Sequence, residues 1–212
     1  MPKKKQFIPN SVILKDPDIT DSIYEVSFAS KIKKYKANQP STDWRPFQPT
    51  LEKQGNTSDC TCFSRTNCAE TVAIKSKVTD DNSNEFNFSD LYLAVGSGTS
   101  QNGNSLKAPS EFFRKEGIVL QQDCNYDTDM LNSPNATWTK RKIKFNTAKN
   151  DTRIKKYKGG NYSFVTPSPA LLKDALTYSP LQIAIGLDYT YNNDGVIPAP
   201  IKVVAYHAIT LQ

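Results

Sequence analysis

The spacing of apolar residues changes near residue 137, and this change constrains the fold more than any other feature of the chain. Before it, helical spacing predicts three helices, at about residues 60–78, 87–95 and 110–115, with Asn87 or Ser89 as the N-cap of the second. After it, alternating apolar and polar residues predict four half-buried strands, at residues 142–145, 153–157, 181–187 and 201–210. One more helix is expected at about residues 167–178. The sequence therefore predicts an α+β protein.

Three segments follow from this pattern. Residues 1–42 form a polar, basic N-terminal arm that prolines interrupt, residues 43–136 form a helical lobe, and residues 137–212 form a β-rich lobe. The arm shows no long helical pattern. We therefore expect it to wrap around the domain or to bind a partner, and not to fold as a unit of its own.

Composition narrows the classes of function. The chain has 212 residues and a net charge of +6, and 37% of its residues are hydrophobic, which is typical of a globular protein. Its basic runs alternate with Ile or Tyr, as on a solvated strand face, and no aromatic-basic module accompanies them, so nucleic acid is not the expected partner. No segment predicts a membrane span or a signal peptide.

The four cysteines and the single histidine bear on compartment and cofactors. Cys60 and Cys62 are too close to pair comfortably, and Cys68 and Cys124 show no disulfide spacing, so all but Cys60 are interpreted as packing residues. One histidine and scattered cysteines offer no closed zinc site, and no cofactor is expected. Without an export signal or a disulfide framework, the expected location is the cytoplasm or the inside of an assembled particle.

Cys60 is the candidate nucleophile. It precedes a helix-forming run, and the positive end of a helix dipole favours the reactive thiolate. Gln54 stands six residues earlier, before a Gly55 turn, and is spaced to donate a hydrogen bond near the sulfur. His207 supplies the one imidazole. A nucleophile, an oxyanion donor and an imidazole are the minimum for acyl transfer by a cysteine enzyme.

These residues and their order resemble the papain-like cysteine peptidases over about residues 43–212. The segment 58–64, Ser-Asp-Cys-Thr-Cys-Phe-Ser, is similar to the family's Ser-Cys-Trp-Ala-Phe-Ser, and Gln-Gly precedes both. Other segments that match in the same order lie at residues 43–45, 101–104, 111–118, 124–126, 170–176, 179–185, 195–197 and 206–209.

The resemblance implies a papain-like two-lobe fold, a helical lobe and an antiparallel β-barrel-like lobe with a cleft between them, that hydrolyses a peptide or protein substrate. It implies that Cys60 is the nucleophile, that His207 is the acid and base, and that Gln54 with the Cys60 backbone N–H holds the oxyanion. The substrate-binding residues that it implies are Gly103 and Asn104, which would pair with the substrate backbone, Ala184, at the floor of the main specificity pocket, and Tyr206.

The sequence departs from the family in several places. Asp59 adds a carboxylate beside the nucleophile, which would disfavour the thiolate unless it points into solvent, and Thr61 replaces a tryptophan. The family's later Asn-Ser-Trp motif, whose asparagine orients the histidine, is absent from the sequence, as are the closing strands. We expect the strand at residues 201–212 to be covered by a C-terminal continuation or by a partner chain that also orients His207.

Two other functions are consistent with parts of this pattern. The domain could be an inactive papain-fold module with a binding or structural role, for example in a virus or phage particle, and Asp59, Thr61 and the missing asparagine favour this reading. A transglutaminase or amidase would share the Cys–His pair, but not the matches at residues 43–45 and 195–196.

Overall fold

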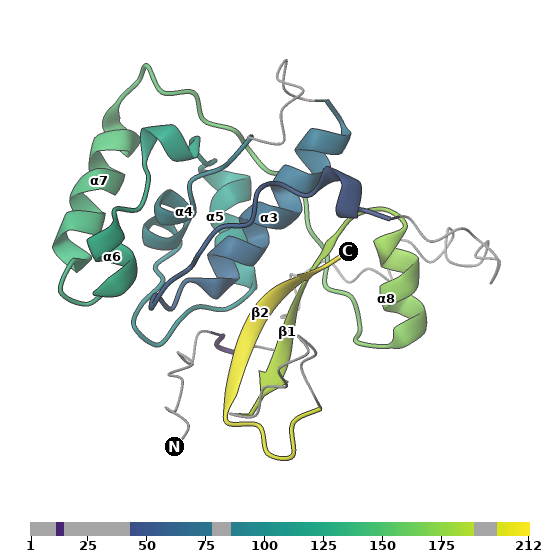
Figure 1. Cartoon of the computed structure of the whole chain (residues 1–212). Helices are drawn as coiled ribbons and strands as arrows, with labels where there is room; N and C mark the ends of the chain where they lie inside the picture. The colour runs from purple at the N-terminus through teal and green to yellow at the C-terminus, as the bar shows by residue number, and fades with distance from the viewer. Residues whose placement is uncertain (1–11, 15–42, 78–85, 189–198) are drawn as a thin grey trace.

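The computed structural model describes residues 12–14, 43–77, 86–188 and 199–212. One group of elements is helical: η1 (Arg45–Phe47), α3 (Cys60–Lys75), α4 (Asp90–Gly96), α5 (Lys107–Lys115), η2 (Gln121–Asp123), α6 (Thr128–Asn132) and α7 (Trp138–Asn150). The other group consists of α8 (Pro169–Leu176), β1 (Leu181–Leu187) and β2 (Ala205–Leu211). Figure 1 shows α3 to α7 gathered on one side of the molecule and the two strands with α8 on the other. The predicted α+β class is confirmed.

Serine caps fix the starts of two helices. The Ser89 hydroxyl accepts a hydrogen bond from the Tyr92 N–H at 2.9 Å, which decides between the two predicted caps of α4. Ser168 caps α8 through the Leu171 N–H, and Pro169 follows at the first helical position, where its missing N–H costs nothing. Both caps leave the helix starts where the sequence predicts them to within a few residues.

The predicted strands at residues 142–145 and 153–157 are wrong. Residues 138–150 form α7, whose buried side chains are Arg141, Phe145 and Ala148, a helical spacing of four and three. Ile143, which suggested alternation, is 60% exposed. The second segment forms no strand and pairs with the rest of the protein through a single bridge from Tyr157 to Ile118. Helix α7 packs against α4, where the Phe145 ring lies 4.8 Å from that of Tyr92.

The two strands form an antiparallel pair in which His207 lies opposite Ile185 and Ala208 lies opposite Ala184. The first strand coincides with its prediction, but the second begins at Ala205 and not at Ile201, which is 96% exposed. The predicted match at residues 195–197 and most of the N-terminal arm lie outside the described residues. The sheet therefore presents the one histidine of the chain in the middle of a paired strand.

The main hydrophobic core lies among α3, α4, α5 and α7. Its fully buried members include Leu91, Leu93, Ile118 and Met130, and Phe88 and Phe113 pack edge to face within it at 5.5 Å. Trp44 joins this part to the other, because its indole N–H donates to the Leu176 carbonyl of α8 at 2.6 Å. The core fixes α3, which carries Cys60 at its first residue.

Two carboxyl groups, those of Glu70 in α3 and Asp90 in α4, are buried in the helical part. The Phe88 N–H donates to Glu70 at 2.6 Å, the Thr66 hydroxyl donates to Asp90, and both carboxyls are nearly inaccessible. Burial, together with the nearby Glu52 charge, raises the pKa of Glu70 to about 8 and raises the pKa of Asp90 well above its usual range. Both carboxyls therefore bind protons more tightly in the folded protein than in the unfolded chain.

This cluster predicts that Glu70 makes the protein less stable as the pH rises. Because its pKa is higher in the folded state, the folded state holds more protons between pH 4.5 and about 8, and each pKa unit corresponds to about 1.4 kcal/mol. We expect Glu70→Gln to raise the free energy of unfolding in urea by more at pH 8 than at pH 5. An equal effect at both pH values would contradict the prediction.

Candidate active site

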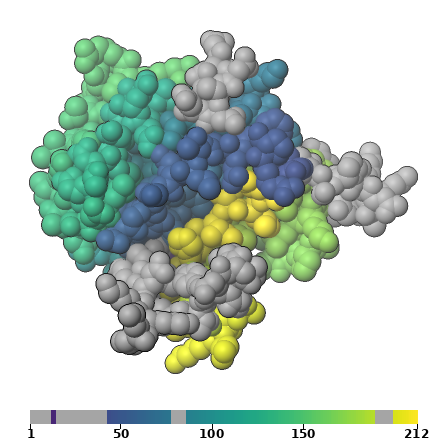
Figure 2. All heavy atoms as spheres, in the orientation of Figure 1, coloured from purple at the N-terminus to yellow at the C-terminus, as the bar shows by residue number. Residues whose placement is uncertain are grey.

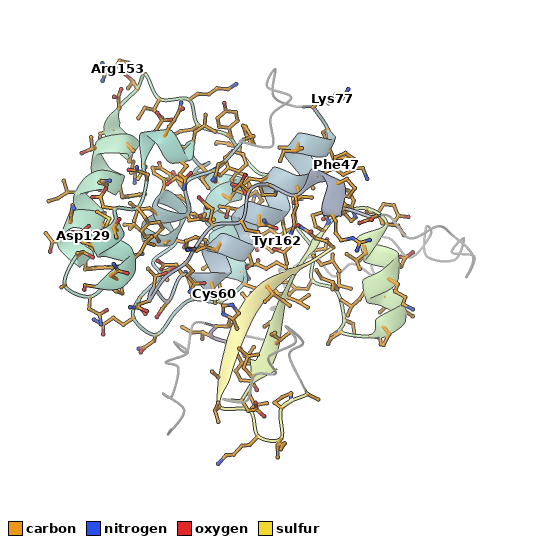
Figure 3. The ribbon with its side chains drawn as sticks, viewed as in Figure 1. Phe47, Cys60, Lys77, Asp129, Arg153 and Tyr162 are labelled. Carbon is orange, nitrogen blue, oxygen red and sulfur yellow. The ribbon has the colours of Figure 1, made fainter. Side chains whose placement is uncertain are left out.

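Cys60 and the backbone of His207 meet where α3 begins against the sheet. The Ala208 N–H lies 3.4 Å from the Cys60 Sγ, so the peptide bond between His207 and Ala208 rests against the thiol although 148 residues separate the two ends of the contact. The Gln182 amide of β1 donates to the Thr61 carbonyl at 2.6 Å, and the Thr210 hydroxyl of β2 donates to the Ser64 carbonyl at 3.2 Å. Figure 3 shows Cys60 at the end of α3 that lies beside β2.

His207 is half-buried, and burial lowers the pKa of its imidazole. The neutral ring is therefore favoured unless a negative charge faces it. The contact of the Ala208 N–H with the Cys60 Sγ holds the backbone next to His207 at the start of α3. A neutral imidazole can accept a proton, which is what a general base requires.

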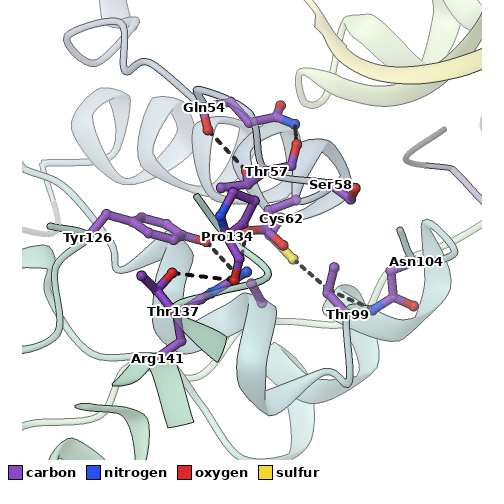
Figure 4. Close-up of polar contacts among 12 residues, drawn as sticks. Gln54, Thr57, Ser58, Cys62, Thr99, Asn104, Tyr126, Pro134, Thr137 and Arg141 are labelled. Carbon is purple, nitrogen blue, oxygen red and sulfur yellow. Dashed lines mark hydrogen bonds and ion pairs between the residues drawn. The ribbon is translucent and has the colours of Figure 1, made fainter. Parts of the chain in front are cut away.

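The Gln54–Thr57 loop stands before α3. The Gln54 amide donates to the Thr57 carbonyl at 2.6 Å, and the Thr57 hydroxyl donates back to the Gln54 carbonyl at 3.0 Å, so the loop is closed by two bonds of its own (Figure 4). Gly55 within it has a positive φ of 63°, which glycine adopts without strain. One amide N–H of Gln54 is thus used inside the loop, and the amide retains a second donor.

Asp59 does not point into solvent. Its side chain is 1% exposed, and its carboxylate accepts hydrogen bonds from Arg141 at 2.6 Å and from the Tyr126 hydroxyl at 2.5 Å (Figure 4 shows both donors). Burial raises the pKa of Asp59, whereas the charge of Arg141 and the hydroxyls of Tyr126 and Thr57 act in the opposite direction. The sequence left two possibilities for Asp59, a carboxylate in solvent or one that disfavours the thiolate. The structure shows neither, because Asp59 forms a buried ion pair with Arg141.

The loop after α4 holds the two residues expected to bind a substrate backbone. The Gly103 N–H and C=O both bond to Ser100, in a tight turn with a φ of 81° at the glycine. The Asn104 side chain points inward and donates to Ser97 and to Thr99, which explains how an asparagine fits where the family has glycine. The Asn104 carbonyl faces the other way and accepts from the Ile13 N–H at 2.8 Å.

Val12, in the N-terminal arm, packs against the candidate nucleophile. Val12 forms a parallel bridge with Asn104 and is buried in one cluster with Cys60 and Ala208, against which Ala184 packs. Within this cluster, Cys60 is only 1% exposed. Tyr206 lies in β2 opposite Gly186 and is 37% exposed. Of the residues implied as substrate-binding, Ala184 packs against this cluster, Gly103 and Asn104 lie in the loop after α4, and Tyr206 lies at the surface of β2.

We predict that Cys60 is the most reactive of the four thiols. All four thiols are buried, and burial raises the pKa of Cys68 and of Cys124 to about 11 and that of Cys62 further. Only Cys60 stands at a helix start against the histidine strand. Limited alkylation with iodoacetamide followed by peptide mapping measures the order of labelling. Labelling of any other cysteine ahead of Cys60 would refute this assignment.

Neither a metal site nor a membrane span is found in the part of the chain that the structure describes. No group of three or more His, Cys, Asp or Glu side chains among those residues could hold a metal ion. None of their helices is long and apolar enough to cross a membrane.

No protein-family model and no curated protein sequence matches the chain. Solved structures do match it. Xylellain, a cysteine protease from Xylella fastidiosa, superposes with a TM-score of 0.68 and 21% identity over 99% of this chain and 81% of its own. The Amb a 11 cysteine protease, a ragweed pollen allergen in its proform, gives 0.55 and 17% over 95% of this chain and 60% of its own. The Carica candamarcensis cysteine protease CMS1MS2, in complex with E-64, gives 0.50 and 16% over 81% and 76%.

These likenesses confirm that the fold is papain-like. The structure itself identifies residues of the site that the sequence did not single out. Arg141 and Tyr126 complete the environment of Asp59, and Val12 covers Cys60. A buried-charge argument could have suggested a cationic partner for Asp59, since carboxylates are rarely buried unpaired, but nothing in the sequence indicated Arg141 rather than another cation.

Proposed function

We propose that the protein is a papain-like cysteine peptidase that cleaves peptide bonds through an acyl-enzyme on Cys60, with His207 as acid and base. The observation that carries this proposal is the 3.4 Å contact between the Ala208 N–H and the Cys60 Sγ. It brings the strand with the only histidine of the chain to the helix start with the candidate nucleophile. The fold shared with three cysteine proteases supports the same reaction class.

The chemical steps balance with these two groups and water. The Cys60 thiolate attacks the carbonyl carbon of the substrate and forms a C–S bond, while the imidazolium of His207 donates its proton to the leaving amine as the C–N bond breaks. Water then attacks the thioester carbonyl and gives a proton to the neutral imidazole. The acid product leaves, and the thiolate and imidazolium are restored.

The transition state needs donors for its oxyanion. The N-terminus of α3 and the Gln54 amide would supply them, and each donor of this kind contributes roughly 3 kcal/mol where it has been measured. The hydrogen bond from Gln54 to Thr57 holds the side chain in its loop, and the second amide N–H would bind the oxyanion. Asn104 would bind the substrate backbone through the carbonyl that Ile13 now uses, and Gly103 would shape the turn beside it.

The second candidate is a papain-fold module that binds without cutting, for example in a virus or phage particle. The observation that favours it is the covered thiol, because Cys60 is 1% exposed and is buried in one cluster with Val12 and Ala208. An active peptidase needs this cover to move. A binding module does not.

The sheet bears on how His207 would be oriented. Among the described residues, β2 pairs in a sheet only with β1, and its Ala208 N–H is directed to the Cys60 Sγ. A strand with a single strand neighbour can pair with a further strand. A strand from the same chain or from a partner subunit that pairs with β2 would hold His207 and supply an acceptor for its ring. Addition of a strand to an open sheet edge is a common mode of recognition.

Cleavage of a peptide mixture tests the proposal. The unmodified protein and a Val12→Asp variant are incubated with peptides from an unfolded protein, and new termini are identified by mass spectrometry. We expect new termini that disappear when Cys60 is alkylated beforehand. No new termini with either protein would favour the binding module.

A further inference from the structure

The side chain of Asp59 does not cap α3, although its position at the start of the helix predicts that it would. Asp59 is the N-cap residue of α3, and its carbonyl accepts from the N–H groups of Cys62 and Phe63 at 2.8 and 3.1 Å. An aspartate at this position usually accepts a hydrogen bond from the first helical turn through its side chain. Here the side chain makes no capping bond to α3. It turns into the helical part and binds Arg141 and Tyr126.

Arg141 comes from α7 and is as deeply buried as its partner, with 3% of its side chain exposed against 1% for Asp59. Its guanidinium also bonds to the Tyr126 hydroxyl at 3.1 Å and lies 4.8 Å from the centre of the Trp138 ring. Tyr126 in turn stacks on Phe63, one turn into α3, with ring centres 5.8 Å apart. The pair is thus built into the packing around the start of α3.

The position of this carboxylate matters for the adjacent thiol. If it capped α3, its negative charge would lie at the same helix end as Cys60, where it would oppose both a thiolate and an oxyanion. The Thr57 hydroxyl, in the loop that carries Gln54, also interacts with the Asp59 carboxylate in its present position. One ion pair therefore joins α7, the Gln54–Thr57 loop and the first turn of α3.

We propose that Arg141 is a positioning residue for the nucleophile: it holds the Asp59 carboxylate away from the N-terminus of α3 and neutralises its charge, so that the helix end serves Cys60. This inference rests on the proposed function, because it assigns Arg141 a role in making Cys60 reactive. It adds a residue from α7, the segment whose sequence pattern suggested a strand. Tyr126 shares the task as the second donor to Asp59.

Few charged or titratable groups lie near Cys60 among the described residues, so few substitutions can shift the pH at which its thiol ionises. Asp59 precedes it, Arg141 and Tyr126 face Asp59 from the helical part, and His207 belongs to the strand that contacts the sulfur. Val12, Ala184 and Ala208 pack around it and carry no charge. Substitutions of Asp59 and Arg141 therefore alter the local charge in opposite directions, and both leave His207 in place.

The test is the pH profile of Cys60 alkylation, which does not depend on turnover. Arg141→Met leaves the carboxyl without its cation, and we expect the midpoint of Cys60 alkylation to move up by about one pH unit, a tenfold slower reaction on the acid side of the midpoint. Asp59→Asn removes the negative charge and leaves the cation, so the midpoint should move down. The double variant should return close to the unmodified protein.

Lys140→Met is the matched control. Lys140 lies next to Arg141 on α7 but pairs with the half-buried Asp127 and the exposed Asp129 at 2.7 and 3.1 Å, so its replacement should leave the midpoint unchanged. If Arg141→Met does not fold, as judged by circular dichroism, Asp59→Asn carries the test through its downward shift. A purely structural ion pair would lower stability in both single variants without moving the midpoint, and that result would overturn the proposal. If the alkylation midpoints shift as expected but the protein cleaves no peptide, the proposed peptidase activity is wrong and the role of Arg141 stands.

Discussion

Replacement of Cys60 by serine, or of His207 by alanine, is expected to abolish peptide cleavage. Serine lacks an acidic sulfur at the helix start, and alanine removes the only imidazole of the chain. Loss of one member of a nucleophile–base pair costs about 10³-fold or more in kcat, and removal of both should cost little more, because the two act as a unit. Steady-state turnover of a peptide found in the cleavage experiment measures the effect.

Cys62→Ala is the control for this prediction. Cys62 stands two residues further along α3, is fully buried, and contacts the Thr99 hydroxyl at 3.5 Å on the side away from the sheet. Its replacement should lower stability modestly and leave most of the turnover. If all three variants lose turnover equally, the assay reports folding, and the assignment of Cys60 and His207 fails.

Val12→Asp is expected to increase the reactivity of Cys60. Val12 is buried against Cys60 and Ala208, and burial of a valine side chain contributes about 1.5–3 kcal/mol. A charged aspartate cannot occupy this apolar cluster, so the segment should leave it. If the cover limits access to the sulfur, opening it raises the rate of alkylation and of cleavage roughly tenfold or more.

Ile13→Asp provides the comparison for Val12. Ile13 is 42% exposed and contributes its backbone N–H, not its side chain, to the bond with Asn104, so a charge there should change the rates much less. Alkylation of Cys60 at equal rates in Val12→Asp and in the unmodified protein would show that Val12 does not limit access. Circular dichroism of both variants checks that the domain remains folded.

Helices and strands that are marked by a local sequence feature, such as a capping residue or a regular spacing of apolar residues, could be predicted from the sequence. The run after Cys60 gave α3 to within three residues at its end, a serine cap marked α4, and the alternation at residues 181–187 marked β1. The strand predicted at residues 142–145 is wrong because Lys-Ile-Lys-Phe alternates over only four residues. A run of this length is too short to distinguish a strand from a helix. The helical spacing appears only when Arg141 is counted as a buried residue, and an arginine is a poor candidate for burial.

The candidate site was predictable in its members but not in its contacts. The position of Cys60 at a helix start follows from local sequence, and His207 stood out as the only imidazole. The ion pair from Asp59 to Arg141 spans 82 residues, and the bridge from Val12 to Asn104 joins the arm to a loop. Such contacts depend on how elements far apart in the sequence pack together. Figure 2 shows one case, in which the C-terminal strand (yellow) lies against the first helical segment of the chain (dark blue).

The central claim is that Cys60 forms an acyl-enzyme, and trapping this species tests it most directly. The Val12→Asp variant, with the cover displaced, is mixed with an activated peptide ester, quenched in acid and digested, and the Cys60 peptide is examined by mass spectrometry. We predict that the mass of this peptide increases by the mass of the acyl group and that the adduct is lost again on return to neutral pH. The adduct should form much more slowly in a variant that also carries His207→Ala. Absence of the adduct, or its appearance on Cys62, Cys68 or Cys124 instead, would show that Cys60 is not the nucleophile.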